Sequence, residues 1–357
     1  MKAIMSAKET IKNGHKLAAI NIPEESPKRK SFLRLLLSRK TLTFLRIISL
    51  VVIAGIIYLQ RDKILQALGQ SLSIGWWFFF LFPLFSLWNW VAVNGWMQLI
   101  SATPRNSIPS KTRLFMVRIE AQALNFLLPL ASLGGEVLKS TLTATDEGLK
   151  SSVPPVILDK IATFVSEVIF VLTGIALFIT IFPVNRPSLF ICAVLALAVL
   201  IILLSWQKIF KFISRIYMFS NNSSVSKVIT MLALRKEFHL SLYKAIGWHF
   251  LERILMAMEL FVIARALGIP LGLTAVLFAS GLTAGFSLLL FFMPGQLGAF
   301  EGGLVYAFSL LGLSPTLGLT VALIRRGRQL VTCGLGLFLL FVIEKNTNKR
   351  KRTMEKK

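Results

Sequence analysis

The run from Leu288 to Gly303 constrains the fold of this chain more than any other feature of its sequence. It continues an apolar stretch and contains Pro294, which lacks a backbone N–H donor, together with glycines that weaken a helix. These break glycines are Gly295, Gly298 and Gly302. We therefore predict an apolar helix that stops here and restarts beyond Glu301. At membrane depth such a break survives only where protein or a water-filled cavity surrounds it.

A second stretch, from Asn125 to Glu136, repeats the same order of an apolar run, a proline, glycines and a glutamate. Its break residues are Pro129, Gly134 and Gly135. The two prolines lie about 165 residues apart, and the apolar helices predicted near 74–100 and 241–267 keep that offset. We predict two copies of one unit, repeat A over about 74–180 and repeat B over about 241–343. Alternatively, proline and glycine only kink two membrane-spanning helices.

The composition is typical of a polytopic membrane protein. Of 357 residues, 55% are hydrophobic, which leaves little room for a large water-soluble domain. Lys and Arg number 40 against 16 acidic residues, and the net charge of +24 indicates cytoplasmic loops that meet anionic lipid rather than a nucleic-acid surface. Cys192 and Cys333 lie in apolar runs and predict neither a disulfide framework nor a zinc site.

The charge distribution predicts the domain organisation. We expect a disordered basic cytoplasmic tail over 1–40, a transmembrane domain over 41–343 and a basic cytoplasmic tail over 344–357. Within the transmembrane domain, residues 207–240 should form an interfacial helix that links the repeats. Basic residues from Arg105 to Arg118 place the loop after the second helix in the cytoplasm.

The predicted fold class is all-α, with two inverted repeats that each contain a re-entrant helix pair. About six helices would span the membrane, near 44–60, 74–100, 153–180, 187–206, 241–267 and 315–343. Two cytoplasmic ends require an even number of crossings, which about ten spans also provide if each broken pair crosses fully. In the six-span version the second helix enters the cytoplasm while its repeat partner leaves it, so the halves are inverted.

Three arginines in the last predicted helix are too costly to face lipid. Arg325 lies roughly 15 Å into the helix that begins near Pro315, and Arg326 and Arg328 are its neighbours. Each would cost roughly 2.5 to 3.5 kcal/mol at the centre of a lipid-facing helix, so they must face a cavity or acidic partners. The candidate partners are Glu136, Asp159, Glu167, Glu301, and the pair Glu252 and Glu259, which share one helical face.

Two interpretations of these charges stay open. The basic excess favours an anionic headgroup such as phosphate, which arginine binds with its fork of N–H donors. The N-termini of broken helices would add oriented N–H groups for the same anion. Alternatively, the charges form ion pairs that only hold the helix bundle together.

The sequence shows no enzymatic or metal-binding motif. The three histidines, His15, His239 and His249, have no metal-ligand spacing, and we expect His249 to be a core histidine with satisfied hydrogen bonds. There is no Walker-type phosphate loop, no Gly-x-Ser-x-Gly and no recognisable Ser-His-Asp set. We therefore predict neither an enzymatic activity nor a cofactor.

Over about residues 40–343 the chain resembles the lysylphosphatidylglycerol synthase transmembrane region, also called the flippase-like family of bacterial and archaeal membrane proteins. The similarity is carried by Pro129, Gly135, Glu136 and Lys139, by Pro294, Gly295, Gly298, Glu301 and Gly302, and by the helix from Ser314 and Pro315 with its arginine at 325 or 326. Asp159 and Lys160 are similar to the family's acid-base pair. The aspartate that usually follows three residues later is Thr163 here, and Glu167 is the candidate substitute.

The resemblance implies a multi-pass protein of the bacterial inner membrane that translocates a lipid without synthesising it. Some relatives carry a soluble aminoacyl-transferring domain where this chain has a short basic tail. The expected partners are membrane lipids with an anionic headgroup, with a homo-oligomer or a lipid-synthesis protein as further options and no nucleic acid. The expected substrate-binding residues are Glu136, Lys139, Glu301, Arg325, Arg326 and Arg328, supported by Asp159, Lys160, Glu167 and Glu252.

The alternative function is a non-transporting membrane subunit that supports a lipid- or envelope-modifying enzyme. A headgroup-sized cavity open to one leaflet would favour translocation. A sealed bundle with exposed apolar faces would favour the subunit.

Overall fold

The computed structural model describes residues 61–103, 106–127, 134–144, 149–181, 197, 236–290, 296 and 298–354. These residues form helices and short connections, with no strand among them. Several predictions concern other parts of the chain and lie outside the described residues. They are the tail over 1–40, the helix near 44–60, nearly all of the helix near 187–206, the linker up to residue 235, and the break residues Pro129, Pro294 and Gly295.

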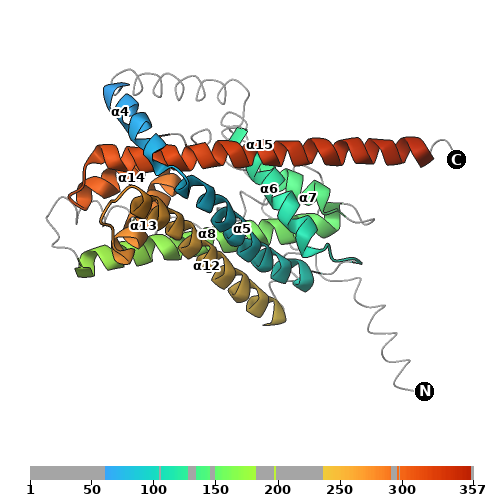
Figure 1. The fold of residues 1–357 in the computed structure, drawn as a ribbon. Coiled ribbons are helices and arrows are strands. Elements are labelled where there is room, and N and C mark those ends of the chain that lie inside the picture. The colour runs from blue at the N-terminus through green and yellow to red at the C-terminus, as the bar shows by residue number, and fades with distance from the viewer. Residues whose placement is uncertain are drawn as a thin grey trace, which may run out of the picture. The chain divides into compact units, whose positions relative to one another are not determined.

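Ten helical elements make up the described part of the chain (Figure 1). They are α4 (Arg61–Ser71), the short 3-10 helix η2 (Leu72–Ile74), α5 (Trp77–Ala102), α6 (Lys111–Leu127), α7 (Gly134–Leu142), α8 (Leu149–Ile181), α12 (Lys236–Ala266), α13 (Leu273–Leu289), α14 (Ala299–Leu310) and α15 (Pro315–Met354). Helices α5, α8, α12 and α15 lie where the sequence predicts long apolar helices. Helix α12 begins five residues inside the predicted linker, and α15 continues into the predicted C-terminal tail.

The apolar character of these helices is that of a membrane-integral protein. Among the described residues, Trp77–Ala102 and Ser151–Ile179 are long and apolar enough to cross a membrane, and α13 and α14 are shorter apolar helices. Large apolar side chains are exposed at the start of α5 and along α15, where acyl chains can cover them. Examples are Trp76, Phe79, Phe80, Leu330, Phe338 and Phe341.

The helix ends at both predicted breaks. Helix α6 stops at Leu127 and α7 starts at Gly134, while α13 stops at Leu289 and α14 starts at Ala299. In the second break Gln296 and Gly298 have φ of 55° and 82°, values that end a right-handed helix. The prediction that Glu301 lies in the break is wrong. The new helix has already begun there, because the Glu301 carboxylate accepts the Gly298 N–H and caps the first turn of α14.

The break glycines Gly134, Gly135 and Gly302 likewise lie in the first turns of the restarted helices, not in the breaks. Close packing explains one of them. A Cβ atom on Gly135 would lie 2.3 Å from the Ala121 carbonyl oxygen, so only glycine lets α7 approach α6 this closely.

Each broken segment folds back into a hairpin of two helices. At the turn, the Gly135 N–H donates to Asn125 Oδ1 at 2.6 Å, and at the open end Arg113 donates to the Leu142 carbonyl at 2.8 Å. Helices α6 and α7 are therefore antiparallel. In the second hairpin Gly303 of α14 packs directly against Thr283 of α13. A helix that was merely kinked would not reverse direction, so the kink alternative is wrong for these two segments.

Helix α12 packs mainly against α5 and α8. Helices α5 and α12 lie side by side (Figure 1). Gly95 makes this possible, because its Cα faces the Ala245 carbonyl and the His249 ring. Helix α8 crosses α13 at facing glycines, Gly174 and Gly281, and α15 packs along α6. The largest apolar core joins α8, α12, α13, α14 and α15.

The neighbouring glycines Gly302 and Gly303 test the second hairpin. A Cβ on Gly303 would lie 2.8 Å from Thr283 Cα, whereas a Cβ on Gly302 meets nothing within 4 Å. We expect Gly303→Ala to lower the free energy of unfolding by about 1–3 kcal/mol through overpacking. Gly302→Ala should leave it unchanged or raise it by up to about 1 kcal/mol, because alanine favours a helix. Thermal melts of the two purified variants in detergent measure both effects. Equal melting temperatures would contradict the close packing of α13 and α14.

Candidate functional site

Nine polar side chains from five helices form one buried hydrogen-bonded network around α12. We call it the polar network. It consists of Asn89 of α5, Arg118 and Gln122 of α6, Glu136 and Lys139 of α7, Asp159 and Lys160 of α8, and His249 and Glu252 of α12. All except Gln122 and Lys160 are buried. Buried charges persist only when they are paired and hydrogen-bonded, and these are.

Arg118 connects α6 to α5 and α12. Its Nη2 donates to Glu252 Oε1 at 2.5 Å, and its Nε donates to Asn89 Oδ1 at 3.0 Å. Gln122 donates to the same Asn89 oxygen at 2.7 Å. Arg118 is among the basic residues predicted to place the loop after the second helix in the cytoplasm, but it lies within α6. A carboxylate on a helix distant in the sequence holds this guanidinium inside the bundle, so its charge says nothing about the loop.

Lys139 lies between two carboxylates. Its Nζ is 3.0 Å from Glu136 Oε2 on the same helix and 3.2 Å from Asp159 Oδ2 on α8. Lys160 approaches the other oxygen of Glu136 at 3.5 Å. The Lys139 ammonium also lies 5.3 Å from the centre of the Trp96 ring, a cation–π contact. These contacts fix α7 against α8.

His249 joins the two halves of the polar network. Its Nδ1 is 2.8 Å from Glu252 Oε2, and its Nε2 is 2.9 Å from Asp159 Oδ1. The side chain is fully buried. The expectation of a core histidine with satisfied hydrogen bonds is confirmed, and the sequence gives no indication that both partners are carboxylates.

A second charged group lies further along α12. Glu259 accepts a hydrogen bond from Nε of Arg325 at 2.9 Å and another from Nε of Arg328. Two arginines of α15 therefore share one carboxylate. We call these three residues the arginine cluster. All three are buried. Aromatic rings cover the guanidinium groups, with Phe300 over Arg325 and both Phe85 and Trp88 over Arg328.

Arg326 points elsewhere and holds the second break. Its Nε donates to Glu301 Oε1 at 2.5 Å, and its Nη2 donates to the Gln296 carbonyl at 3.1 Å. One arginine of α15 thus binds both the irregular backbone and the first turn of α14. Because Glu301 also caps Gly298, the break is tied to α15 by charge as well as by hydrogen bonds.

The six predicted substrate-binding residues fall into three groups rather than one. Glu136 and Lys139 belong to the polar network, Arg325 and Arg328 to the arginine cluster, and Arg326 with Glu301 to the second break. The two buried carboxylates of α12, Glu252 and Glu259, explain the separation, because seven residues of helix place them about 10 Å apart along the axis. Of the supporting charges, Asp159, Lys160 and Glu252 join the polar network, and Glu167 pairs with Arg253 at 3.2 Å.

Four functional candidates were missed from the sequence: Asn89, Arg118, Glu120 and Gln122. A signal was available for α6, where Arg118 and Glu120 interrupt a run of apolar residues. Glu120 is fully buried, and neither carboxylate oxygen has a hydrogen-bond partner among the described residues. An ionised carboxylate in that position would be very costly, so burial favours the neutral form of Glu120.

Charge balance separates the groups. The polar network holds three cations and three carboxylates, and Arg326 is balanced by Glu301. In the arginine cluster, the described residues offer a single carboxylate to two guanidinium groups. Among the described residues, the cluster therefore has one positive charge more than its single carboxylate balances.

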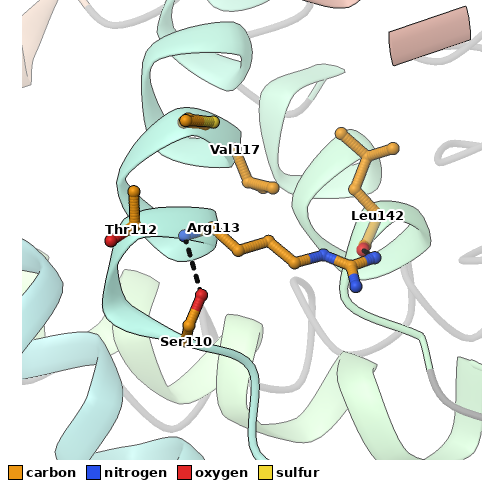
Figure 2. Close-up of a pocket in the computed structure, with 6 residues that line it drawn as sticks. Ser110, Thr112, Arg113, Val117 and Leu142 are labelled. Carbon is orange, nitrogen blue, oxygen red and sulfur yellow. Dashed lines mark hydrogen bonds between the residues drawn. The ribbon is translucent and has the colours of Figure 1, made fainter. Parts of the chain in front are cut away.

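A pocket of about 270 Å³ lies between the start of α6 and the end of α7. Figure 2 shows Arg113 reaching across it from α6 toward the Leu142 carbonyl, beside Ser110, Thr112 and Val117. No predicted substrate-binding residue lines it. Within the described part of the chain, no group of three or more His, Cys, Asp or Glu side chains is arranged to hold a metal ion.

Comparison with known proteins gives one match. The family model described as the lysylphosphatidylglycerol synthase TM region matches residues 46–336, which include both hairpins and every charged group described above. No curated protein and no solved structure matches the chain.

Two glutamates test whether the polar network stabilises the bundle. We expect Glu252→Gln to lower the free energy of unfolding by about 3–5 kcal/mol, because Arg118 is then buried without a carboxylate. Glu120→Gln should change it by less than about 1 kcal/mol, since the amide replaces a neutral carboxyl group of the same shape. Chemical or thermal unfolding in detergent measures both. A Glu252→Gln protein as stable as the native one would contradict the structural role of this ion pair.

Proposed function

We propose a function from one premise: the chain belongs to the family of the lysylphosphatidylglycerol synthase transmembrane region. That family indicates a membrane domain associated with lipid modification or translocation. We propose that this protein translocates an amphiphile with an anionic headgroup across the membrane. The proposal rests on the charges and the helix arrangement described above.

The uncompensated charge of the arginine cluster is the observation that carries the proposal. Removing an unpaired guanidinium group from water costs several kcal/mol unless an anion meets it. A phosphate accepts several N–H donors at once, and arginine presents those donors in a planar fork. We assign Arg325 and Arg328 to the headgroup phosphate, with Glu259 holding both in place.

The helix arrangement supports the inverted repeats predicted from the sequence. Glu136 is the third residue of α7, and Glu301 is the third residue of α14. Each meets a cation on the next long helix, Lys160 on α8 and Arg326 on α15. The same acid-base pair therefore recurs about 165 residues apart, at the restart of each broken segment.

Packing between the two repeats is also reciprocal. Helix α8 of repeat A packs on α13 of repeat B, and α15 of repeat B packs on α6 of repeat A. Helices α5 and α12 run antiparallel, because Gly95 lies beside His249 while Trp88 and Glu259 meet at Arg328. An antiparallel pair of equivalent helices is what two inverted halves require. We propose that the hairpins α6–α7 and α13–α14 are the re-entrant pairs.

In this conformation the arginine cluster is closed to solvent. Arg325, Arg328 and Glu259 are all buried, so a headgroup reaches them only after helices separate. We propose that α15 moves relative to α12, because the arginine cluster joins those two helices and its single carboxylate is the contact a phosphate would replace. The interruptions of the helices beside the site would allow that motion.

One observation favours the second candidate function, a non-transporting subunit that supports a lipid- or envelope-modifying enzyme. The one pocket described above avoids the predicted substrate-binding residues. Their charges are joined into ion pairs, and apolar faces are exposed on α5 and α15. Under this alternative the arginines only hold the bundle together, and the variant below decides between the two.

Arg328→Gln separates the two functions. It leaves Arg325 and Glu259 as a balanced pair, so we expect a melting temperature within a few degrees of the native value. The site loses its excess charge, and movement of an anionic lipid should fall by about tenfold or more. The assay uses purified protein in phosphatidylcholine vesicles with labelled phosphatidylglycerol and an external quencher of the label. Labelled phosphatidylcholine is the control lipid.

The outcomes of this assay are distinct. Rapid phosphatidylglycerol movement by the native protein and slow movement by a stable Arg328→Gln variant support the proposal. If the native protein is correctly inserted but moves no lipid, the result would support the non-transporting subunit. Equal movement by native and variant proteins would overturn the assignment of the headgroup to the arginine cluster.

A further inference from the structure

The hydrogen bonds of His249 fix the number of protons in the middle of the polar network. Both ring nitrogens lie within hydrogen-bond distance of carboxylate oxygens, of Glu252 at 2.8 Å and of Asp159 at 2.9 Å. A neutral imidazole has one N–H, and an ionised carboxylate can only accept. Two such contacts therefore need two protons. We call His249, Asp159 and Glu252 the proton triad.

The extra proton sets the charge of the whole polar network. Facing the proton triad are Arg118 of α6, Lys139 and Glu136 of α7, and Lys160 of α8, while α5 contributes the uncharged Asn89. On α12 itself, Arg253 is balanced by Glu167. With the extra proton the network carries one net positive charge, and without it the network is neutral.

A route from the proton triad toward solvent runs through the other side chains of the network. Asp159 forms an ion pair with Lys139, Lys139 forms one with Glu136, and Glu136 forms one with Lys160. The Lys160 side chain is 32% exposed, whereas the triad members are 5% exposed or less. The buried proton is therefore connected to the only clearly accessible cation among the nine residues.

We propose that the proton triad is a proton-binding site that couples lipid translocation to the proton gradient. This inference rests on the proposed function. A proton from water on one side of the membrane binds the triad, and the positive charge that it adds to the polar network favours the binding of an anionic headgroup at the arginine cluster. The proton and the headgroup leave together on the other side, where the proton returns to water. One proton moving with one singly charged headgroup makes the step electroneutral.

A proton gradient across reconstituted vesicles tests the coupling. The probe is labelled phosphatidylglycerol, a singly charged lipid, in phosphatidylcholine vesicles that contain the full-length protein. Electroneutral coupling predicts that a gradient of about one pH unit shifts the final ratio of labelled lipid between the leaflets about tenfold, toward the alkaline side. A membrane potential of either sign should leave that ratio unchanged.

Variants locate the proton. His249→Gln removes the titratable ring, and His249→Lys keeps a fixed charge between the two carboxylates, so both should abolish the tenfold asymmetry. His239→Gln is the matched control, because His239 is exposed on the same helix and should leave the asymmetry intact. A thermal melt confirms that each variant is folded before it is assayed.

The outcomes distinguish this inference from the proposed function. A native protein that equalises phosphatidylglycerol between leaflets regardless of the pH gradient would overturn the coupling and leave translocation standing. If a folded His249 variant kept the tenfold lipid asymmetry, the assignment of the coupling proton to the triad would be wrong. A native protein that moves no lipid would overturn the proposed function itself.

Discussion

The buried carboxylates of α12 link this helix to α6 and to α15 through ion pairs. Glu252 forms an ion pair with Arg118 of α6, and Glu259 forms ion pairs with Arg325 and Arg328 of α15. One face of α12 therefore contacts both predicted repeats. Because a buried charge without its partner costs several kcal/mol, any rotation of α12 that broke one pair would be opposed. Helix α5 completes the arrangement, since Trp88 covers Arg328 while its neighbour Asn89 receives Arg118. Stability and the proposed function thus involve the same side chains.

The polar network and the arginine cluster differ in net charge. We propose that this difference lets ion pairs both hold the helix bundle together and bind a substrate. In the polar network every permanent cation has a carboxylate, and only the proton triad changes the total charge. In the arginine cluster, the described residues place two permanent cations on one carboxylate, which leaves an excess positive charge. We propose that the excess positive charge of the arginine cluster binds the headgroup. The proton bound by the proton triad then changes the electrostatic field that the headgroup meets.

Local rules predicted most of the fold, and long-range pairing explains what they missed. Apolar length located α5, α8, α12 and α15, and proline with glycine located both breaks. The helix restarts were placed too late, because Gly135 is required by contact with Ala121 rather than by a flexible loop. The charge of Arg118 predicts a neighbouring cytoplasmic loop when charges are counted along the chain. Its partner Glu252 lies 134 residues away, and no local pattern carries that information.

The central claim is that the uncompensated charge of the arginine cluster binds an anionic lipid. Native mass spectrometry of protein extracted gently from its membrane tests this most directly, because it weighs the lipids that stay bound. Our account predicts that the native protein retains an anionic phospholipid and that Arg328→Gln, with Arg325 and Glu259 still paired, loses it. Identical lipid retention by both proteins, or retention of zwitterionic lipid alone, would contradict the claim.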